Sequence, residues 1–341
     1  MPHVTQFIRL VMRLTDKERA VYRATELAPF RPAKSIAKQL GCREHTVHHA
    51  LQRLKEKRLF NPQPILNMYM FGFMDFTYFF SLAAIKSKGE RKSFIGALTD
   101  SPAVSWLGEL GGQYHYGVSI LANHVLHAKQ ILDDAVRSSK AAIVSRDLSI
   151  RTGTHFFGRK YIYPANLRTS AINPPIHYDS AATTFELDEI DKEILRHLYS
   201  HSCPSDRTLA SLISVPAPTI NRRRQRLEQH HVIAGYRNYV PAHELGVNRY
   251  KIILSCKGFD SALVKQLVRF CNVAPQVTHL IECCGGWDFE IGTELFDASD
   301  IVPISEKLYD TFGDQIDSLE VIPEFRGIKF ESLPFGKSRQ L

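Results

Sequence analysis

The side chains best suited to chemistry form a basic and polar cluster at positions 219–226, which read TINRRRQR. Ile220 and Leu227 are seven residues apart, so the segment predicts a helix with one apolar face. Arginine suits phosphate and guanine, and asparagine suits adenine. Glu228 is the only acid within this helix, so we expect the cluster to face outward and bind double-stranded DNA. The predicted contacts are Thr219, Asn221, Arg222, Arg223, Arg224 and Arg226.

A related segment lies 173 residues earlier, at positions 44–54, and reads EHTVHHALQRL. Residues 1–60 hold thirteen Lys and Arg residues against five acids, so we expect this region to bind the DNA backbone. The three histidines have a spacing that could suit a metal, but nothing nearby clearly completes a site, and no metal site is predicted. The predicted DNA contacts here are Arg43, His45, Thr46, His48, His49 and Arg53.

Both segments follow a pattern of small residues that indicates a helix-turn-helix. Ala37, Gly41 and Val47 have spacings of four and six, and so do Ala210, Ser214 and Ile220. Small residues permit two helices to pack across a tight turn, and the second helix then enters the major groove. A capping box at Thr15-x-x-Glu18 and a cap at Asp188 predict where each first helix begins.

Three sequence blocks share the offset of 173 residues, including Gln52-Arg53-Leu54 against Gln225-Arg226-Leu227. We interpret the chain as a unit of roughly 165 residues written twice. The second part of each unit predicts the ferredoxin-like order βαββαβ. Strands are expected near 76–85, 103–110, 115–121 and 142–151, and at 249–256, 276–283, 287–295 and 316–323, with helices near 90–99, 124–138, 259–271 and 298–312.

The predicted fold class is therefore α+β, with two helix-turn-helix domains alternating with two ferredoxin-like domains. The helix-turn-helix domains are placed at 1–63 and 185–240, and the ferredoxin-like domains at 64–163 and 241–331. Prolines and small polar residues at 164–184 predict a linker that is loop or spacer, and 332–341 is a tail. The open faces of the ferredoxin-like sheets are expected to pair, within the chain as a pseudo-dimer or between chains in a homo-oligomer.

Composition agrees with a globular, DNA-binding protein. The 341 residues are 44% hydrophobic, and 43 Lys and Arg against 35 Asp and Glu give a net charge of +8. Six cysteines without a CxxC pair, and no recognisable signal peptide, predict reduced thiols and a cytoplasmic location. Residues 65–85 are strongly apolar, but Asp75 in their middle argues against a membrane span.

Positions 187–198 (LDEIDKEILRHL), 208–236 and 282–292 (ECCGGWDFEIG) resemble the Lrp/AsnC family of transcriptional regulators. GELGGQYHYG at 108–117 resembles it less closely. The resemblance implies a DNA-binding regulator with a small-molecule, amino-acid-like effector near a Gly-x-Tyr-Asp turn. It implies effector contacts at Gly285, Gly286, Trp287, Asp288, Gly112, Tyr114 and His115. Trp287 and His115 depart from the family pattern, which puts ordinary amino-acid sensing in question.

An enzyme is the main alternative. Siroheme decarboxylases have a similar architecture, and Val277-Thr278-His279 resembles their motif. Residues 280–287 lack the further His and Arg expected for binding a tetrapyrrole with propionate groups, and no nucleophile, phosphate loop or carboxylate pair is evident. We therefore predict that the protein is not an enzyme and needs no cofactor. An architectural DNA-binding protein without an effector is a third interpretation.

Overall fold

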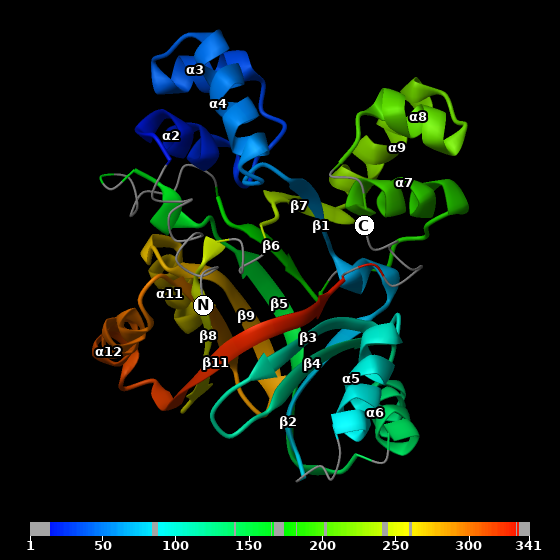
Figure 1. Ribbon diagram of the computed structural model, residues 1–341, viewed down its shortest axis with the longest axis vertical. Helices are drawn as coiled ribbons and strands as arrows, with labels where there is room; N and C mark the ends of the chain where they lie inside the picture. The colour runs from blue at the N-terminus through cyan, green and yellow to red at the C-terminus, as the bar shows by residue number, and fades with distance from the viewer. Residues whose placement is uncertain are drawn as a thin grey trace.

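Two βαββαβ units form the centre of the structure (Figure 1). The computed structural model describes residues 14–83, 88–139, 141–164, 166, 174–181, 183–200, 203–240, 245–258, 261–331 and 333. The first unit contains β2 (Met74–Leu82), α5 (Lys88–Asp100), β3 (Val104–Leu110), β4 (Tyr116–Ala122), α6 (Val125–Ser139) and β5 (Ile143–Phe156). The second contains β8 (Asn248–Cys256), α11 (Ser261–Val273), β9 (Val277–Gly285), β10 (Phe289–Leu295), α12 (Ile301–Phe312) and β11 (Ile316–Phe330). The predicted α+β class is confirmed.

The eight strands of the two units close into a barrel. Their order is β2-β4-β3-β11-β8-β10-β9-β5, and β2 also pairs with β5. Antiparallel pairing of β5 with β9 and of β11 with β3 joins the two units within one chain. β5 and β11 run further than predicted, to Phe156 and Phe330, and their extra residues pair with the other unit. The strand ends therefore depend on tertiary pairing, which the local pattern does not contain.

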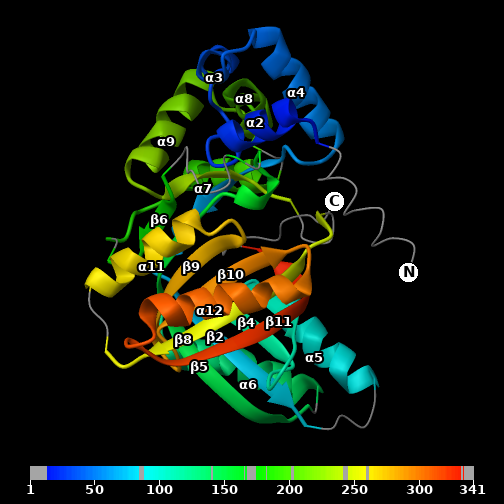
Figure 2. The same ribbon diagram turned by 90° about the vertical axis from the view of Figure 1, so that its left-hand side faces the viewer.

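Helices cover the outside of the barrel. Apolar side chains fill the barrel interior at one end. Phe94 and Leu98 of α5 and Leu132 of α6 pack on the first unit, whereas α11 and α12 cover the second (Figure 2). Inside, where the two units face each other, a separate apolar cluster consists of Phe79, Trp106, Leu110, Tyr114, Ile253, Ile281, Cys283, Trp287 and Ile322. We call it the interior cluster.

Two three-helix domains lie at one end of the barrel (Figures 1 and 2). One contains α2 (Asp16–Thr25), α3 (Ala33–Leu40) and α4 (Glu44–Glu56), and the other α7 (Glu189–Ser200), α8 (Asp206–Ile213) and α9 (Ala217–Gln229). Gly41 and Ser214 both take the left-handed conformation at the predicted turn, with φ of 61° and 60°. Val47 and Ile220 on the second helices are fully buried, as the pattern predicts.

The helix starts also follow the sequence. Thr15 and Glu18 form the reciprocal capping box, and the Asp188 carboxylate accepts a hydrogen bond from the Asp191 amide at 2.9 Å. Helix α9 begins at Ala217, after Pro216 at the N-cap, and Pro218 is tolerated in its first turn because N–H groups there have no partner within the helix. The strands that lead out of the two domains, β1 (Pro62–Leu66) and β7 (Ile233–Asn238), pair with each other.

One part of the predicted linker is a strand. β6 (Ile176–Asp179) adds to the sheet beside β5, a pairing that the proline-rich composition of the linker does not indicate. Short 3-10 helices occur at η1 (Met68–Phe71), η2 (Lys160–Ile162) and η4 (Ala298–Asp300). Some predicted segments lie outside the described residues. They are 84–85 at the end of a predicted strand, 259–260 at the start of a predicted helix, and the predicted tail at 332–341 apart from Leu333. Of the helices in the described ranges, none is long and apolar enough to span a bilayer.

Candidate functional site: a basic pocket at the barrel mouth

A pocket of about 500 Å³ lies at the end of the barrel where residues that follow α2 and residues of β7 meet the two units. Its walls come from both units, from β7, and from the end of α2 at Glu26 and Leu27. Seven basic side chains line it, against four acids. The basic residues are Arg151, Arg159, Arg237, Arg249, Lys251, Arg326 and Lys329, and the acids are Glu26, Asp75, Glu294 and Glu324.

A buried charged layer forms the floor. The Arg151 guanidinium donates to both carboxylate oxygens of Glu290, at 3.2 and 2.8 Å, and lies 3.3 Å from Asp75. Lys251 Nζ approaches the same Glu290 carboxylate at 3.5 Å. Burial by itself would raise the pKa of Glu290, but the charges of Arg151 and Lys251 outweigh it and hold the pKa at about 2. The floor is therefore an ionised network beneath the pocket.

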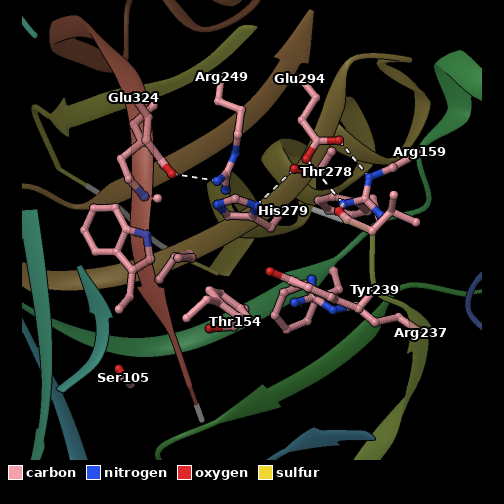
Figure 3. A pocket seen from close by; sticks show the side chains of 18 of the residues that line it. Ser105, Thr154, Arg159, Arg237, Tyr239, Arg249, Thr278, His279, Glu294 and Glu324 are labelled. Atoms are coloured by element: carbon pink, nitrogen blue, oxygen red, sulfur yellow. Dashed lines mark hydrogen bonds and ion pairs between the residues drawn. The ribbon is translucent and has the colours of Figure 1, made fainter. Parts of the chain in front are cut away.

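Two further arginines on the walls are held by glutamates. The Arg159 Nε atom donates to Glu294 at 2.7 Å, and Arg249 donates to Glu324 at 2.6 Å. Figure 3 shows Glu294 beside Arg159 and Glu324 beside Arg249. Burial would raise the pKa of Glu294, but the charge of Arg159 overrides it and the pKa lies at about 2. These pairs orient the guanidinium groups toward one cavity.

Arg237 is held differently. Its guanidinium carbon lies 4.7 Å from the ring centre of Phe156, 5.4 Å from that of Phe330 and 5.9 Å from that of Tyr239 (Figure 3). Within the described part of the chain, no carboxylate forms an ion pair with it. Burial, and then the charge of Arg159, lower the pKa of Arg237. This side chain is thus a cation in an aromatic cage, without an anionic partner from the described residues.

His279 supplies a neutral imidazole to the pocket. The Thr278 hydroxyl donates to the carbonyl of Gly292 at 3.2 Å, so its oxygen accepts a hydrogen bond from His279 Nδ1 at 3.1 Å. This assigns the proton to Nδ1 and leaves a lone pair on Nε2. Burial, and then Lys251 and Arg249, lower the pKa of His279 well below its usual value. Figure 3 shows His279 beside Arg249 and Thr278.

Trp106 provides an aromatic surface at the boundary between the pocket and the interior cluster. A Cβ at Gly108 or at Gly117 would lie 2.7 or 2.6 Å from its indole ring, so the missing side chains make room for it. Lys251 Nζ lies 4.3 Å from the ring centre.

The residues predicted to bind an effector lie in the barrel interior or at its far end, not in the pocket. Trp287 is 3% exposed and stacks on Phe79, with ring centres 4.6 Å apart and an interplanar angle of 19°. Tyr114 packs in the same cluster, and its hydroxyl donates to Asp147 at 2.7 Å. Both aromatic residues therefore help to hold the two units together.

The turn residues around them also make structural contacts. The Asp288 carboxylate accepts from the Cys256 amide at 2.7 Å, and Gly286 donates to the carbonyl of Leu148 at 2.9 Å. A Cβ at Gly285 would lie 2.8 Å from that same carbonyl oxygen. In the first unit, Gly112 has a φ of 77°, and His115 Nδ1 accepts from the Leu82 amide at 3.1 Å. Effector binding at these residues stays a prediction.

The arginines of α9 are paired more fully than the sequence suggests. Arg223 lies 2.6 Å from Asp188 and 2.9 Å from Asp191, and Arg226 lies 3.8 Å from Asp191. Arg224 lies 3.1 Å from Asp206, which also accepts from Asn221 at 2.7 Å. The charge of these arginines is therefore partly compensated, although Glu228 is the only acid within α9, because α7, the residue before it and α8 supply further acids. Arg222 is exposed, and Thr219 is half-buried.

The predicted contacts on α4 lie mostly on its surface. Arg43, His45, His48 and His49 are exposed, and Thr46 is half-buried. Arg53 is exposed and lies 3.8 Å from Glu18, and His48 lies 3.6 Å from Glu44. The structure tests neither set of DNA contacts directly, so both stay predictions.

Sequence reasoning found His279 but missed the basic pocket around it. Residues 280–287 contain no arginine, whereas the pocket arginines come from β5, the segment after it, β7, β8 and β11. Charged residues within otherwise apolar predicted strands, such as Arg151 and Glu290, are a sequence signal that could indicate such a pocket.

Comparisons with known proteins give two results. Residues 187–234 match the family described as winged helix-turn-helix DNA-binding. The fold is similar to the crystal structure of the siroheme decarboxylase NirDL, with 10% identity, a TM-score of 0.61, and 94% of this chain and 95% of that chain covered. The same enzyme in co-complex with an iron-uroporphyrin III analogue gives 11% identity, a TM-score of 0.56, and coverage of 95% and 92%.

Lrp/AsnC-like structures match only part of the chain. An AsnC family transcriptional regulator from Agrobacterium tumefaciens is 16% identical, with a TM-score of 0.38 over 43% of this chain and 95% of that chain. The search of curated proteins finds no match. The prediction that the protein is not an enzyme is contradicted, because the fold shared over nearly the whole chain is that of an enzyme. That prediction depended on finding no catalytic motif in the sequence, and the pocket is assembled from distant segments.

Proposed function

We propose that the barrel-mouth pocket binds an iron tetrapyrrole with carboxylate side chains and that the protein decarboxylates it. The observation that carries the proposal is Arg237, which three aromatic rings enclose and which no described carboxylate pairs. Burying a cation without a partner is costly, so such a group indicates an anionic ligand. A guanidinium is suited to bidentate binding of a carboxylate.

The other lining residues suit the same ligand. The faces of Trp106, Phe156 and Tyr239 suit a flat macrocycle, and the excess of basic side chains suits several carboxylates. His279 offers the Nε2 lone pair of a neutral imidazole, which is an ordinary ligand of haem-type iron. The whole-chain similarity in fold to a siroheme decarboxylase supports this proposal independently of the lining residues.

The chemistry needs few groups from the protein. Decarboxylation breaks the bond from the carboxyl carbon to its neighbour, releases CO₂, and leaves a carbon that takes up one proton. Arg159 and Arg249, held by Glu294 and Glu324, would bind the carboxylates that are retained and so orient the one that is lost. The buried ion pair of Arg151 and Glu290 lies beneath these two arginines, in the floor of the pocket.

An optical titration with iron-uroporphyrin III tests binding, and mass spectrometry of the products tests loss of CO₂. We expect a saturable spectral shift with the full chain. Arg237→Ala should weaken binding about 10- to 100-fold, the loss of one charged hydrogen-bonded contact. Arg222→Ala is the matched control, because this arginine is exposed on α9 and outside the pocket. The absence of a spectral shift, or equal losses in both variants, would refute the proposal.

A second function, DNA binding in transcriptional regulation, is supported by the winged helix-turn-helix match at 187–234. In this proposal α9 reads the major groove and the basic first domain contacts the backbone. We also propose the domain boundaries given above. We further propose that any homo-oligomer forms through other surfaces, because the sheet edges pair within the chain and the open faces enclose the interior cluster. A gel-shift assay on genomic fragments tests DNA binding, and sedimentation tests the assembly.

A further inference from the structure

His155, His177 and Glu282 lie together on three adjacent strands, β5, β6 and β9. Their ligand atoms are all within 4.8 Å of one another. His155 Nε2 lies 2.8 Å from the Glu282 carboxylate, and the two imidazole rings stack with centres 4.1 Å apart and an angle of 14°. We infer that these three side chains bind a divalent first-row transition-metal ion.

The backbone register brings the three ligands together. His155 is directly opposite His177 across the β5–β6 pair, and Glu282 is opposite Gly153 across the β5–β9 pair. A Cβ at Gly153 would lie 3.2 Å from Glu282 Oε1 and 3.6 Å from the Cβ of Asp179. The glycine therefore keeps the space between the carboxylate and the histidines open.

The hydrogen bonds around the cluster favour a bound cation. The carbonyl of Thr154 accepts from His177 Nδ1 at 3.3 Å, so a neutral ring carries its lone pair on Nε2. This Nε2 atom lies 3.2 Å from a carboxylate oxygen of Asp179. A lone pair next to a carboxylate oxygen is repulsive unless a proton or a metal ion lies there. A metal-bound histidine commonly donates its other N–H to a carbonyl, as His177 does.

The cluster is separate from the basic pocket. Successive side chains of a strand point to opposite faces. Thr154, Tyr178 and Ile281 line the pocket, and each is the sequence neighbour of one of the three ligands. The ligands therefore lie on the other face of the sheet. The inference does not depend on the proposed tetrapyrrole chemistry.

Ligand chemistry and exposure define the kind of ion. Two imidazoles and one carboxylate suit Zn²⁺, Fe²⁺ or Co²⁺ better than Mg²⁺ or Ca²⁺, which prefer oxygen ligands. The side chain of His155 is 11% exposed, that of Glu282 24% and that of His177 39%, so water can complete the coordination. A bound ion would attach β6, which lies between the two halves of the chain, to β5 and β9.

Titration of the full chain with Co²⁺ tests the site by visible absorption, and Zn²⁺ competition tests its specificity. We expect one equivalent of Co²⁺ to bind with d–d bands that Zn²⁺ removes and Mg²⁺ does not. His177→Ala and Glu282→Gln should each weaken binding at least about 10-fold, since even outer partners of a ligand contribute that much. Zn²⁺ should raise the melting temperature of the wild type and not that of His177→Ala.

The exposed pair His124 and His127, with ring centres 5.9 Å apart, provides the matched control. The double variant His124→Ala/His127→Ala should bind Co²⁺ as the wild type does. His177 is exposed, so its substitution should leave the circular dichroism spectrum unchanged. Absence of stoichiometric binding, or binding that survives both His177→Ala and Glu282→Gln, would overturn the inference and leave protonated histidines as the explanation of the contacts.

Discussion

The imidazole of His279 occupies the space that a side chain at position 292 would need. A Cβ built on Gly292 would lie 1.9 Å from Cε1 and 2.2 Å from Nε2 of His279. Gly292 lies opposite His279 on the neighbouring strand β10, and its carbonyl accepts the Thr278 hydrogen bond that orients the ring. The missing side chain of Gly292 therefore makes room for the only histidine that lines the pocket among the described residues, and the backbone carbonyl at this position fixes the hydroxyl of Thr278 beside the ring.

Gly292→Ala should displace His279 because no atom can approach a ring this closely. We expect a cost of about 1–3 kcal/mol in the free energy of unfolding, typical of an overpacked site. The spectrum of bound iron-uroporphyrin III should change as it does in His279→Ala. Gly96→Ala on α5 is the control, since its Cβ would meet nothing within 4 Å. A wild-type spectrum in Gly292→Ala would show that the ring position does not matter.

Trp287→Ala should destabilise the joined barrel by about 3–5 kcal/mol, as large aromatic truncations in cores do. The indole is buried against Phe79 of the other unit, so its removal leaves a cavity between them. Urea unfolding measures the loss. Val144→Ala, at a position 65% exposed, should change stability by less than about 0.5 kcal/mol. A Trp287→Ala loss as small as that of Val144→Ala would contradict the role of Trp287.

Two neighbouring arginines on α9 should respond differently to substitution. Arg222 is exposed, so Arg222→Ala should weaken DNA binding and reduce the salt slope by about 1 with little effect on melting. Arg223 pairs with Asp188 and the buried Asp191, so Arg223→Ala should cost about 1–3 kcal/mol of stability. Fluorescence anisotropy with labelled DNA and thermal melting separate the two effects. Equal effects on DNA affinity would argue against this division of roles.

Stability should fall as the pH decreases from about 4.5 to about 2, the usual and folded pKa values of Glu290. A carboxyl with a lowered folded pKa contributes its stability above the unfolded pKa, and loses it as the pH falls through the folded one. The difference corresponds to ~3 kcal/mol for Glu290. The free energy of unfolding, measured with urea at each pH in this range, should depend less steeply on pH in Glu290→Gln than in the wild type. Glu294, with a pKa of about 2, contributes to the remaining pH dependence, as do Glu18 and Asp188, whose pKa values are also lowered. Identical slopes would mean that Glu290 does not titrate in this window.

The helices and most strand positions could be predicted because their signals are local. Gly41 and Ser214 mark the turns, Thr15 and Glu18 form a cap, and the apolar period places Val47 and Ile220 in the cores. Each of these features depends on residues within one or two helical turns. The turn at Gly285 and Gly286 can be predicted for the same reason, but its packing against the other unit cannot.

Charge pairing could not be predicted in the same way. Asp191 on α7, Asp188 just before it and Asp206 on α8 pair with Arg223 and Arg224, and all three lie fifteen or more residues from these arginines in sequence. Composition within α9 alone therefore overestimates the charge that the helix presents to solvent. Only packing of three helices brings the opposite charges into contact.

Two helix-turn-helix segments and two βαββαβ units, in their order along the chain, can be predicted from local patterns, since capping, turn and periodicity act between near neighbours. The contacts between those elements depend on the three-dimensional packing. Closure of the barrel through β5–β9 and β11–β3 brings Arg151, Arg237 and His279 to one pocket, and places His155, His177 and Glu282 on the opposite face. Strand pairing joins residues more than a hundred positions apart, and a local pattern carries no information about partners at that distance.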